Sequence, residues 1–292
     1  LNLLGQLIIL AVMAALLKNL QTAFGSEQVG LITQAVVFMV LFGVATRSFS
    51  VAVEIGRGAI EQMVDFMLAT IPVLSMLLAS LGNLSTAAIF HPVIIFSVNY
   101  FSHIVREIII PLIFFATVLT LINYFSPHFK LKRLADLLRD LSIWALGLLL
   151  TVFVGITAIQ GITGTVADAV GLRAAKLATG TFIPVVGKML SEAVETAAGV
   201  SLLLKNSVTI TGMLILLFIT AFPLLKLLSL ILIYKVASAV IQPLGDTTLG
   251  DCLNAMGNCL ALVFGAVATV SLLFFIAITV IMGAGNALLM LR

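Results

Sequence analysis

The sequence contains very little charge. Only 9% of its 292 residues are Asp, Glu, Lys or Arg, against roughly 25% in a typical soluble domain. A chain with so few charges cannot cover a folded core with a water-facing surface, so the class of soluble globular proteins is excluded. The formal net charge of +3 is small and comes from no run of basic residues, which argues against a nucleic-acid-binding surface.

Cysteine is scarce as well. Cys252 and Cys259 are seven residues apart in a segment that reads as one helix, so they lie about 10 Å apart along its axis, too far for a disulfide. There is no CxxC pair and no Cys/His cluster, so we expect no structural metal. The motifs of phosphate loops, zinc proteases, α/β-hydrolases and dinucleotide-binding folds are missing. We therefore expect no catalytic residues, no cofactor and no ATPase motor in this chain.

Apolar residues are abundant, at 62% of the chain, and the mean hydropathy is +1.27. The apolar runs are continuous rather than alternating, which favours membrane-spanning helices over a β-barrel. We predict an all-α polytopic integral membrane protein with about eight to ten transmembrane or re-entrant helices. The predicted spans are residues 3–17, 29–46, 66–81, 87–101, 108–125, 141–159, 207–222, 227–241 and 258–282. We expect a turn at Gly82-Asn83 and a hairpin turn near Pro223 and Lys226.

Polar residues gather in one stretch, residues 160–206, between long apolar runs. We therefore divide the chain into an N-terminal transmembrane helix bundle (1–159), a polar central insert (160–206) and C-terminal transmembrane helices (207–292). Charged residues inside a membrane chain are costly and usually functional. The central insert is thus the predicted functional core.

Local signals predict two helices in this insert. Thr165 and Asp168 have the spacing of a capping box, and Gly180 fits the position just after a helix end, so a small-residue helix is expected between them. Pro184 suits the first turn of a second helix, amphipathic or re-entrant, that runs to about Leu204, roughly 30 Å.

Lys188, Glu192, Glu195 and Gly199 fall on one stripe of that second helix. In one interpretation they line a conduction or translocation path, because charges in a membrane must face the protein interior or water. In the other, the helix lies at the membrane surface with its charged face in water. The length of the helix permits spanning, whereas its charge density favours lying flat.

The most basic loop, Pro127–Asp140, is predicted to be cytoplasmic, with Trp144 anchoring the following span at the interface. Two faces of small residues allow close helix packing and homo-oligomers within the lipid. They are formed by Gly147, Thr151 and Gly155, and by Gly257, Ala261, Gly265 and Thr269.

The insert also carries a series of residues that resembles the signature of the stage III sporulation protein AE family. The motif residues are Phe182, Ile183, Pro184, Val185, Val186 and Gly187, then Ser191-Glu192-Ala193, and finally the run from Gly199 to Lys205 and Asn206. The family motif has a small residue after Gly187, where this chain has Lys188. The blocks at residues 164–181, 65–73 and 91–92 resemble the family too, so the similarity covers nearly the whole chain.

This resemblance implies a multi-pass protein of the mother-cell membrane that surrounds the developing forespore in endospore-forming bacteria. It implies a subunit of the multi-protein channel, or feeding tube, that links mother cell and forespore. The implied partners are the ring-forming stage III proteins AG and AH, stage II protein Q and the AA ATPase. Members of the family also carry an exported N-terminal segment after a signal peptide.

Three functions are consistent with these observations. The first is a channel or export-gate subunit driven by a partner ATPase. The second is a non-conducting membrane scaffold that anchors the ring-forming partners. The third is a secondary transporter with its site at Lys188, Glu192 and Glu195.

Overall fold

A computed structural model describes residues 27–125, 131–182, 186–244 and 247–290 of the chain, with some side chains inside the helices left out. Within these ranges the chain is helical and contains no strand. The elements are α2 (Glu27–Ser80), α3 (Leu84–Ile104), the π-helix η1 (Val105–Ile109), α4 (Ile110–Phe125), α5 (Lys132–Phe182), α6 (Val186–Ile241), the 3-10 turn η2 (Gln242–Leu244) and α7 (Thr247–Met290). The predicted all-α fold class is therefore confirmed.

Five helical segments in the described residues are long and apolar enough to cross a membrane. They are Met39–Ser80, Leu84–Tyr124, Lys132–Asp168, Val200–Ile241 and Thr248–Gly283. Their lengths of 36 to 42 residues correspond to about 54–63 Å at the α-helical rise, roughly twice the hydrocarbon thickness of a bilayer. Each helix must therefore tilt strongly or extend beyond the hydrocarbon core.

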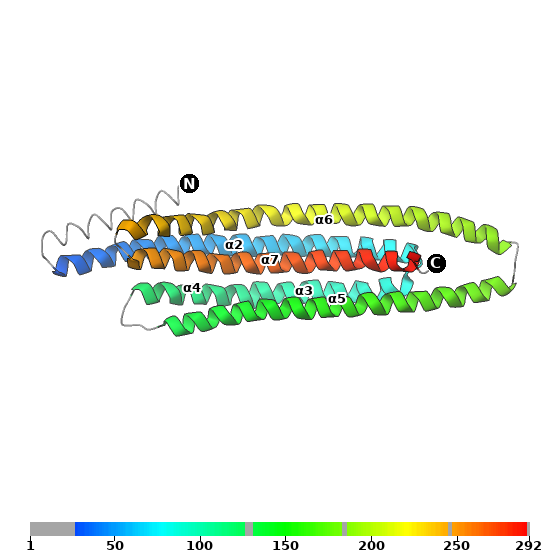
Figure 1. Cartoon of the computed structure of the whole chain (residues 1–292), viewed down its shortest axis with the longest axis horizontal. Helices are drawn as coiled ribbons and strands as arrows, with labels where there is room; N and C mark the ends of the chain where they lie inside the picture. The colour runs from blue at the N-terminus through cyan, green and yellow to red at the C-terminus, as the bar shows by residue number, and fades with distance from the viewer. Residues whose placement is uncertain (1–26, 126–130, 183–185, 245–246, 291–292) are drawn as a thin grey trace. The chain divides into compact units, whose positions relative to one another are not determined.

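The helices are longer than the sequence signals predicted (Figure 1). The hairpin turn expected near Pro223 and Lys226 is wrong, because α6 passes through both residues. A proline removes one backbone hydrogen bond from a helix, whereas a turn in an apolar medium would free several N–H and C=O groups at once. The break expected between residues 101 and 108 is likewise bridged by η1.

Inside the central insert, the helix start predicted at Thr165 and the helix end predicted near Leu204 are wrong. Thr165 and Gly180 both lie within α5, and α6 continues past Leu204 to Ile241. α7 also passes through the glycines at 283 and 285. The three-part division of the chain stays a prediction.

The turn expected at Gly82-Asn83 is confirmed, and its hydrogen bonds show why α2 ends there. Gly82 has a φ of 84°, in the left-handed region that suits glycine at a helix end. The Gly82 and Asn83 amides donate to the carbonyls of Ala79 and Leu78 at 3.0 and 3.2 Å, which satisfies carbonyls at the end of α2.

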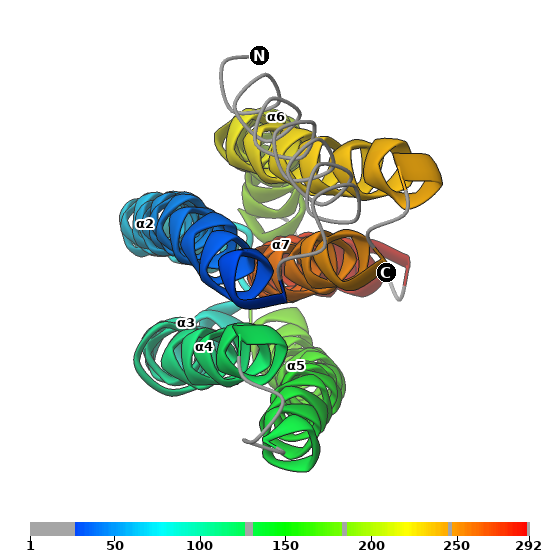
Figure 2. The ribbon, with the colours of Figure 1, turned by 90° about the vertical axis from the view of Figure 1, so that its left-hand side faces the viewer.

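The chain folds into two compact units, and the long helices contribute to both. Unit 1 comprises Leu1–Ala59, Val105–Leu146 and Ala221–Ala268, and unit 2 comprises Ile60–Ile104, Gly147–Thr220 and Thr269–Arg292. In unit 1, α2 and α7 pack closely at Gly56, and the rings of Phe49 and Phe114, 6.0 Å apart, join α2 to α4. Figure 2 looks onto the ends of these helices and shows α7 beside α2 and α6.

In unit 2, the last part of α7 lies between α5 and α6. A Cβ added at Gly161 of α5 would meet Val280 of α7 at 3.5 Å, and Lys205 of α6 reaches the backbone of α7 from the other side. Phe101 and Phe153 form an edge-to-face pair that joins α3 to α5. These contacts pack α3, α5, α6 and α7 together within unit 2.

We expect Gly56→Leu to destabilise unit 1. A Cβ at this position would lie 3.1 Å from Val263 Cγ1 and 3.3 Å from Val267 Cγ2, so a larger side chain must push α2 and α7 apart, at about 1–3 kcal/mol. The measurement is thermal unfolding of the purified chain in detergent.

Gly58→Leu is the matched control. Gly58 lies two residues from Gly56, on the opposite side of α2, and nothing lies within 4 Å of its added Cβ. It should leave the melting temperature unchanged or raise it slightly, since leucine favours a helix over glycine. Equal melting temperatures for the two variants would contradict the close α2–α7 packing.

Candidate functional site

Asp168 of α5 caps the first turn of α3. Its carboxylate accepts hydrogen bonds from the backbone amides of Ser85 (2.8 Å) and Thr86 (3.0 Å), and from the Thr86 hydroxyl. The side chain is buried, with 4% of the residue exposed. A carboxylate at a helix N-terminus is stabilised by the free amides and the partial positive charge there. The cap therefore ties α5 to the α2–α3 turn.

Asn83 occupies the position that normally supplies such a cap. Its carbonyl accepts the first helical bond of α3, from Ala87 at 2.9 Å, yet its own side-chain nitrogen and oxygen are buried with no partner in the described part of the chain. A capping side chain usually comes from this position in the same segment. Here the carboxylate of a distant helix replaces it, which explains why Asp168 does not cap its own helix.

Lys205 of α6 is buried in an apolar part of the chain. The residue has 0% of its surface exposed, and its Nζ donates a hydrogen bond of 2.7 Å to the carbonyl oxygen of Met282 in α7. No carboxylate among the described residues lies within ion-pair distance of it. Lys205 is therefore a charged group inside a membrane span, bound only by a backbone carbonyl in the described part of the chain.

The magnitudes indicate that Lys205 does not stabilise the fold. Burying a charged group away from water costs several kcal/mol, and Lys205 is fully buried although it lies only five residues from the start of its candidate span. A hydrogen bond to a charged group returns roughly 1.5–3 kcal/mol. Since these terms at best cancel, an apolar residue would serve the packing equally well or better.

Two further buried polar atoms lie near these anchors in the sequence. Asn206 Oδ1 follows Lys205 directly, and Gln160 Oε1 lies two turns before Asp168 on α5; neither has a hydrogen-bond partner among the described residues. Buried acceptors of this kind usually bind internal water. This part of unit 2 thus offers acceptors for water as well as a buried charge.

The structure describes only part of the predicted site. Only the helical backbone of α6 is described at four predicted positions, which are Lys188, Glu192, Glu195 and Gly199. The backbone alone is also described at Phe182 and Gly187. The described residues do not include Ile183, Pro184 and Val185. Lys205 and Asn206 are described. The predicted family motif therefore ends where Lys205 joins α6 to α7 through the Met282 carbonyl.

Sequence reasoning missed the role of Asp168, because its partners, Ser85 and Thr86, are more than 80 residues away in the chain. It also missed Lys235 of α6, which binds two asparagine side chains of α7. A lysine in an apolar run was the available signal in that case.

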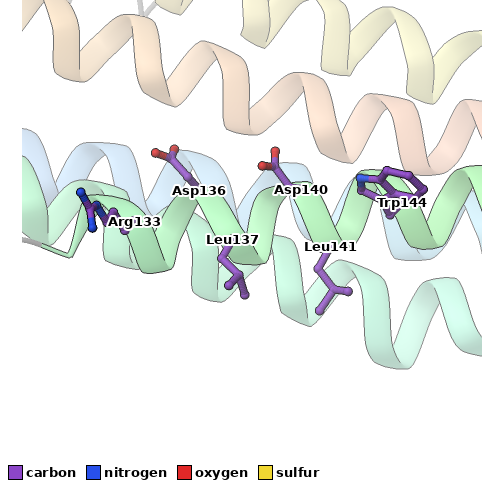
Figure 3. Close-up of a pocket in the computed structure, with 6 residues that line it drawn as sticks. All are labelled: Arg133, Asp136, Leu137, Asp140, Leu141 and Trp144. Atoms are coloured by element: carbon purple, nitrogen blue, oxygen red, sulfur yellow. The ribbon is translucent and has the colours of Figure 1, made fainter.

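A surface hollow on α5 is lined by one stretch of that helix (Figure 3). Its lining residues are Arg133, Asp136, Leu137, Asp140, Leu141 and Trp144. The two aspartates and the tryptophan lie along one side of the helix and the leucines along the other. Exposed tryptophan and leucine beside carboxylates suit a membrane–water boundary. No group of three metal-binding side chains occurs among the residues that were described.

We expect Asp168→Asn to weaken the cap on α3. The amide keeps one acceptor oxygen but turns N–H donors towards backbone amides that also donate, so the change should cost about 1–3 kcal/mol. Asp136→Asn is the control, an exposed carboxylate on the same helix. Thermal unfolding in detergent should show a lower melting temperature for D168N only; equal values would show that the cap contributes nothing.

Comparison with known proteins identifies the chain. A family model described as Stage III sporulation protein AE matches residues 1–285. The stage III sporulation protein AE of Bacillus subtilis (strain 168) is 43% identical over 291 residues, which cover 100% of this chain and 73% of that protein. No solved structure matches the chain. The family resemblance is thereby confirmed, and the chain belongs to the stage III sporulation protein AE family.

Proposed function

We propose that this chain is a membrane-embedded subunit of the channel that links mother cell and forespore, acting as a channel or export-gate component without enzymatic activity. Membership of the family gives the chain a role in sporulation, and its five candidate spans make it a multi-pass membrane protein. Its location would be the mother-cell membrane around the forespore.

Buried Lys205 is the observation that carries this proposal. A charged residue within a membrane span that does not stabilise the fold usually marks a path for ions, water or substrate. Lys205 lies on the same helix as the predicted stripe of Lys188, Glu192, Glu195 and Gly199. Asn206, next to Lys205, falls on that stripe, so polar residues extend from the first turns of α6 into its apolar part.

The proposed partners are those that the family resemblance implies, since the sequence holds no motor motif of its own. Energy for transport would come from the AA ATPase, and the ring-forming AG and AH proteins and stage II protein Q would continue the path outside this membrane. α6 leaves a large apolar surface for such neighbours or for lipid, because only 17% of its most apolar window is buried, against 50% in α7. That surface equally favours the alternative of a non-conducting scaffold.

Lys205→Met separates these functions, because methionine keeps the length and apolar packing and removes the charge. Replacing a buried charge by an apolar residue is often neutral or stabilising, by up to about 1–4 kcal/mol, so K205M should reach normal levels and melt no lower than the parent chain. In an endospore-forming host with this chain as its sole copy, we expect heat-resistant spores to fall on the order of tenfold or more, as for a lost functional charge.

Lys226→Met is the matched control, because it removes an exposed lysine from the same helix and should leave spore yield unchanged. Affinity capture of the partner proteins distinguishes the two functions. A channel subunit with K205M still captures its partners while producing few spores. A scaffold loses spores only together with its partners, and normal spore yield for K205M would contradict the role given to this charge.

A further inference from the structure

Lys235 of α6 is clamped by two amide side chains of α7 within unit 1. Its Nζ donates to Asn254 Oδ1 and to Asn258 Oδ1, both at 2.6 Å. Asn254 and Asn258 are one helical turn apart, so they present their side chains on the same stripe of α7. The three side chains form a polar cluster, here called the Lys235 cluster, in an otherwise apolar region.

The chemistry of the lysine fixes the orientation of both amides. An ammonium group can only donate, so each amide must turn its oxygen towards Lys235 and its NH2 group away from it. In the described part of the chain neither NH2 group has an acceptor. The Lys235 cluster therefore presents a positive charge, one remaining ammonium N–H and two amide NH2 groups, and no carboxylate of the described residues forms an ion pair with it.

The cluster is a built site and is not a chance surface contact. Gly257 lies between the two asparagines, and a Cβ there would be 3.2 to 3.4 Å from the Cε, Cγ and Cδ atoms of Lys235. The lysine stem therefore crosses α7 where glycine leaves room for it. The nearby Ser238 hydroxyl donates to the Gly250 carbonyl at 2.7 Å, which holds the same two helices together.

The position of the cluster suits a membrane boundary. Lys235 lies six residues before the end of one candidate span, at Ile241, and Asn254 six residues after the start of the next, at Thr248. Both are thus about 9 Å from the span ends, close to the depth of phospholipid headgroups and far from the middle of the helices. Lysine and amide donors at this depth meet phosphate diesters.

One acidic residue shares the stripe. Asp251 is exposed and lies three residues before Asn254, one turn closer to the start of α7 and therefore farther out. It makes no ion pair with Lys235 within 4.0 Å. A carboxylate at this place would repel a simple anion but attract the amine of a headgroup whose phosphate is bound at the Lys235 cluster.

We propose that the Lys235 cluster binds the phosphate of a membrane phospholipid, and that Asp251 selects an amine-bearing headgroup such as phosphatidylethanolamine. The phosphate oxygens accept hydrogen bonds from the Lys235 ammonium and from the NH2 groups of Asn254 and Asn258. The ammonium of the headgroup lies against the Asp251 carboxylate. This site goes beyond the proposed channel role and does not depend on it.

The test is native mass spectrometry of the purified full chain after equilibration with phosphatidylethanolamine, phosphatidylglycerol or phosphatidylcholine. The double variant Asn254→Asp/Asn258→Asp keeps acceptor oxygens for Lys235 but replaces the outward N–H donors by carboxylate oxygens. We expect its retention of phosphatidylethanolamine to fall by about tenfold or more, the scale of lost charge-assisted hydrogen bonds. Asn99→Asp, at an exposed asparagine of α3, is the control and should retain lipid normally.

Asp251→Asn tests the headgroup separately and keeps the donors intact. It should abolish the preference for phosphatidylethanolamine over phosphatidylglycerol while total phospholipid binding persists. Unchanged lipid retention in the double variant, with a melting temperature near that of the parent chain, would overturn the site. Displacement of the lipid by millimolar inorganic phosphate would overturn the lipid as its ligand and indicate a free-anion site.

Discussion

A hydrogen-bond donor buried away from water is costly unless it finds an acceptor inside the protein, and the long helices of this chain and the side-chain ties between them follow from that cost. A free N–H or ammonium group in an apolar medium costs several kcal/mol. Helices satisfy their own backbone groups, so α6 extends through Pro223, where a soluble protein could turn. The chain turns between α2 and α3 because Gly82 and Asp168 replace the lost backbone bonds there.

The same requirement makes side chains tie distant helices together. Asp168 joins α5 to α3, Lys205 joins α6 to α7 in unit 2, and Lys235 joins α6 to α7 in unit 1. In each case a polar group of one helix completes the hydrogen bonding of another. Asp168 lies at a helix N-terminus, where a carboxylate gains stability. Lys205 has only a carbonyl partner among the described groups, which is why its retention points to function.

The sequence predicted the fold class and the family well, and the helix ends poorly. Low charge and continuous apolar runs depend on composition alone, so the all-α membrane fold could be read directly from them. The central motif, from Phe182 to Asn206, was specific enough to indicate the family. Turn signals such as Pro223 were misleading, because turn statistics come from soluble proteins, in which water can bind the backbone groups of a broken helix.

The site could be predicted only where its residues are local. Lys205 and Asn206 stand out as polar residues in an apolar run, and the structure adds the carbonyl of Met282 as partner. The cap by Asp168 was not predictable, because its spacing with Thr165 matches a local capping box equally well. Only the packing of α5 against α3 decides which amides this carboxylate meets.

The most direct test of the proposed channel role is the reactivity of single cysteines along α6, in a chain from which Cys252 and Cys259 have been removed. Thiol reagents that cannot cross membranes would be applied from each side. If α6 lines a water-filled path, cysteines at 188, 192, 195 and 199 react while those at Leu190 and Val194 do not. The reactive row should then continue beyond Gly199 to Asn206, which falls on the same stripe. Reactivity that stops at one membrane surface would contradict the channel and leave α6 as a helix of a scaffold.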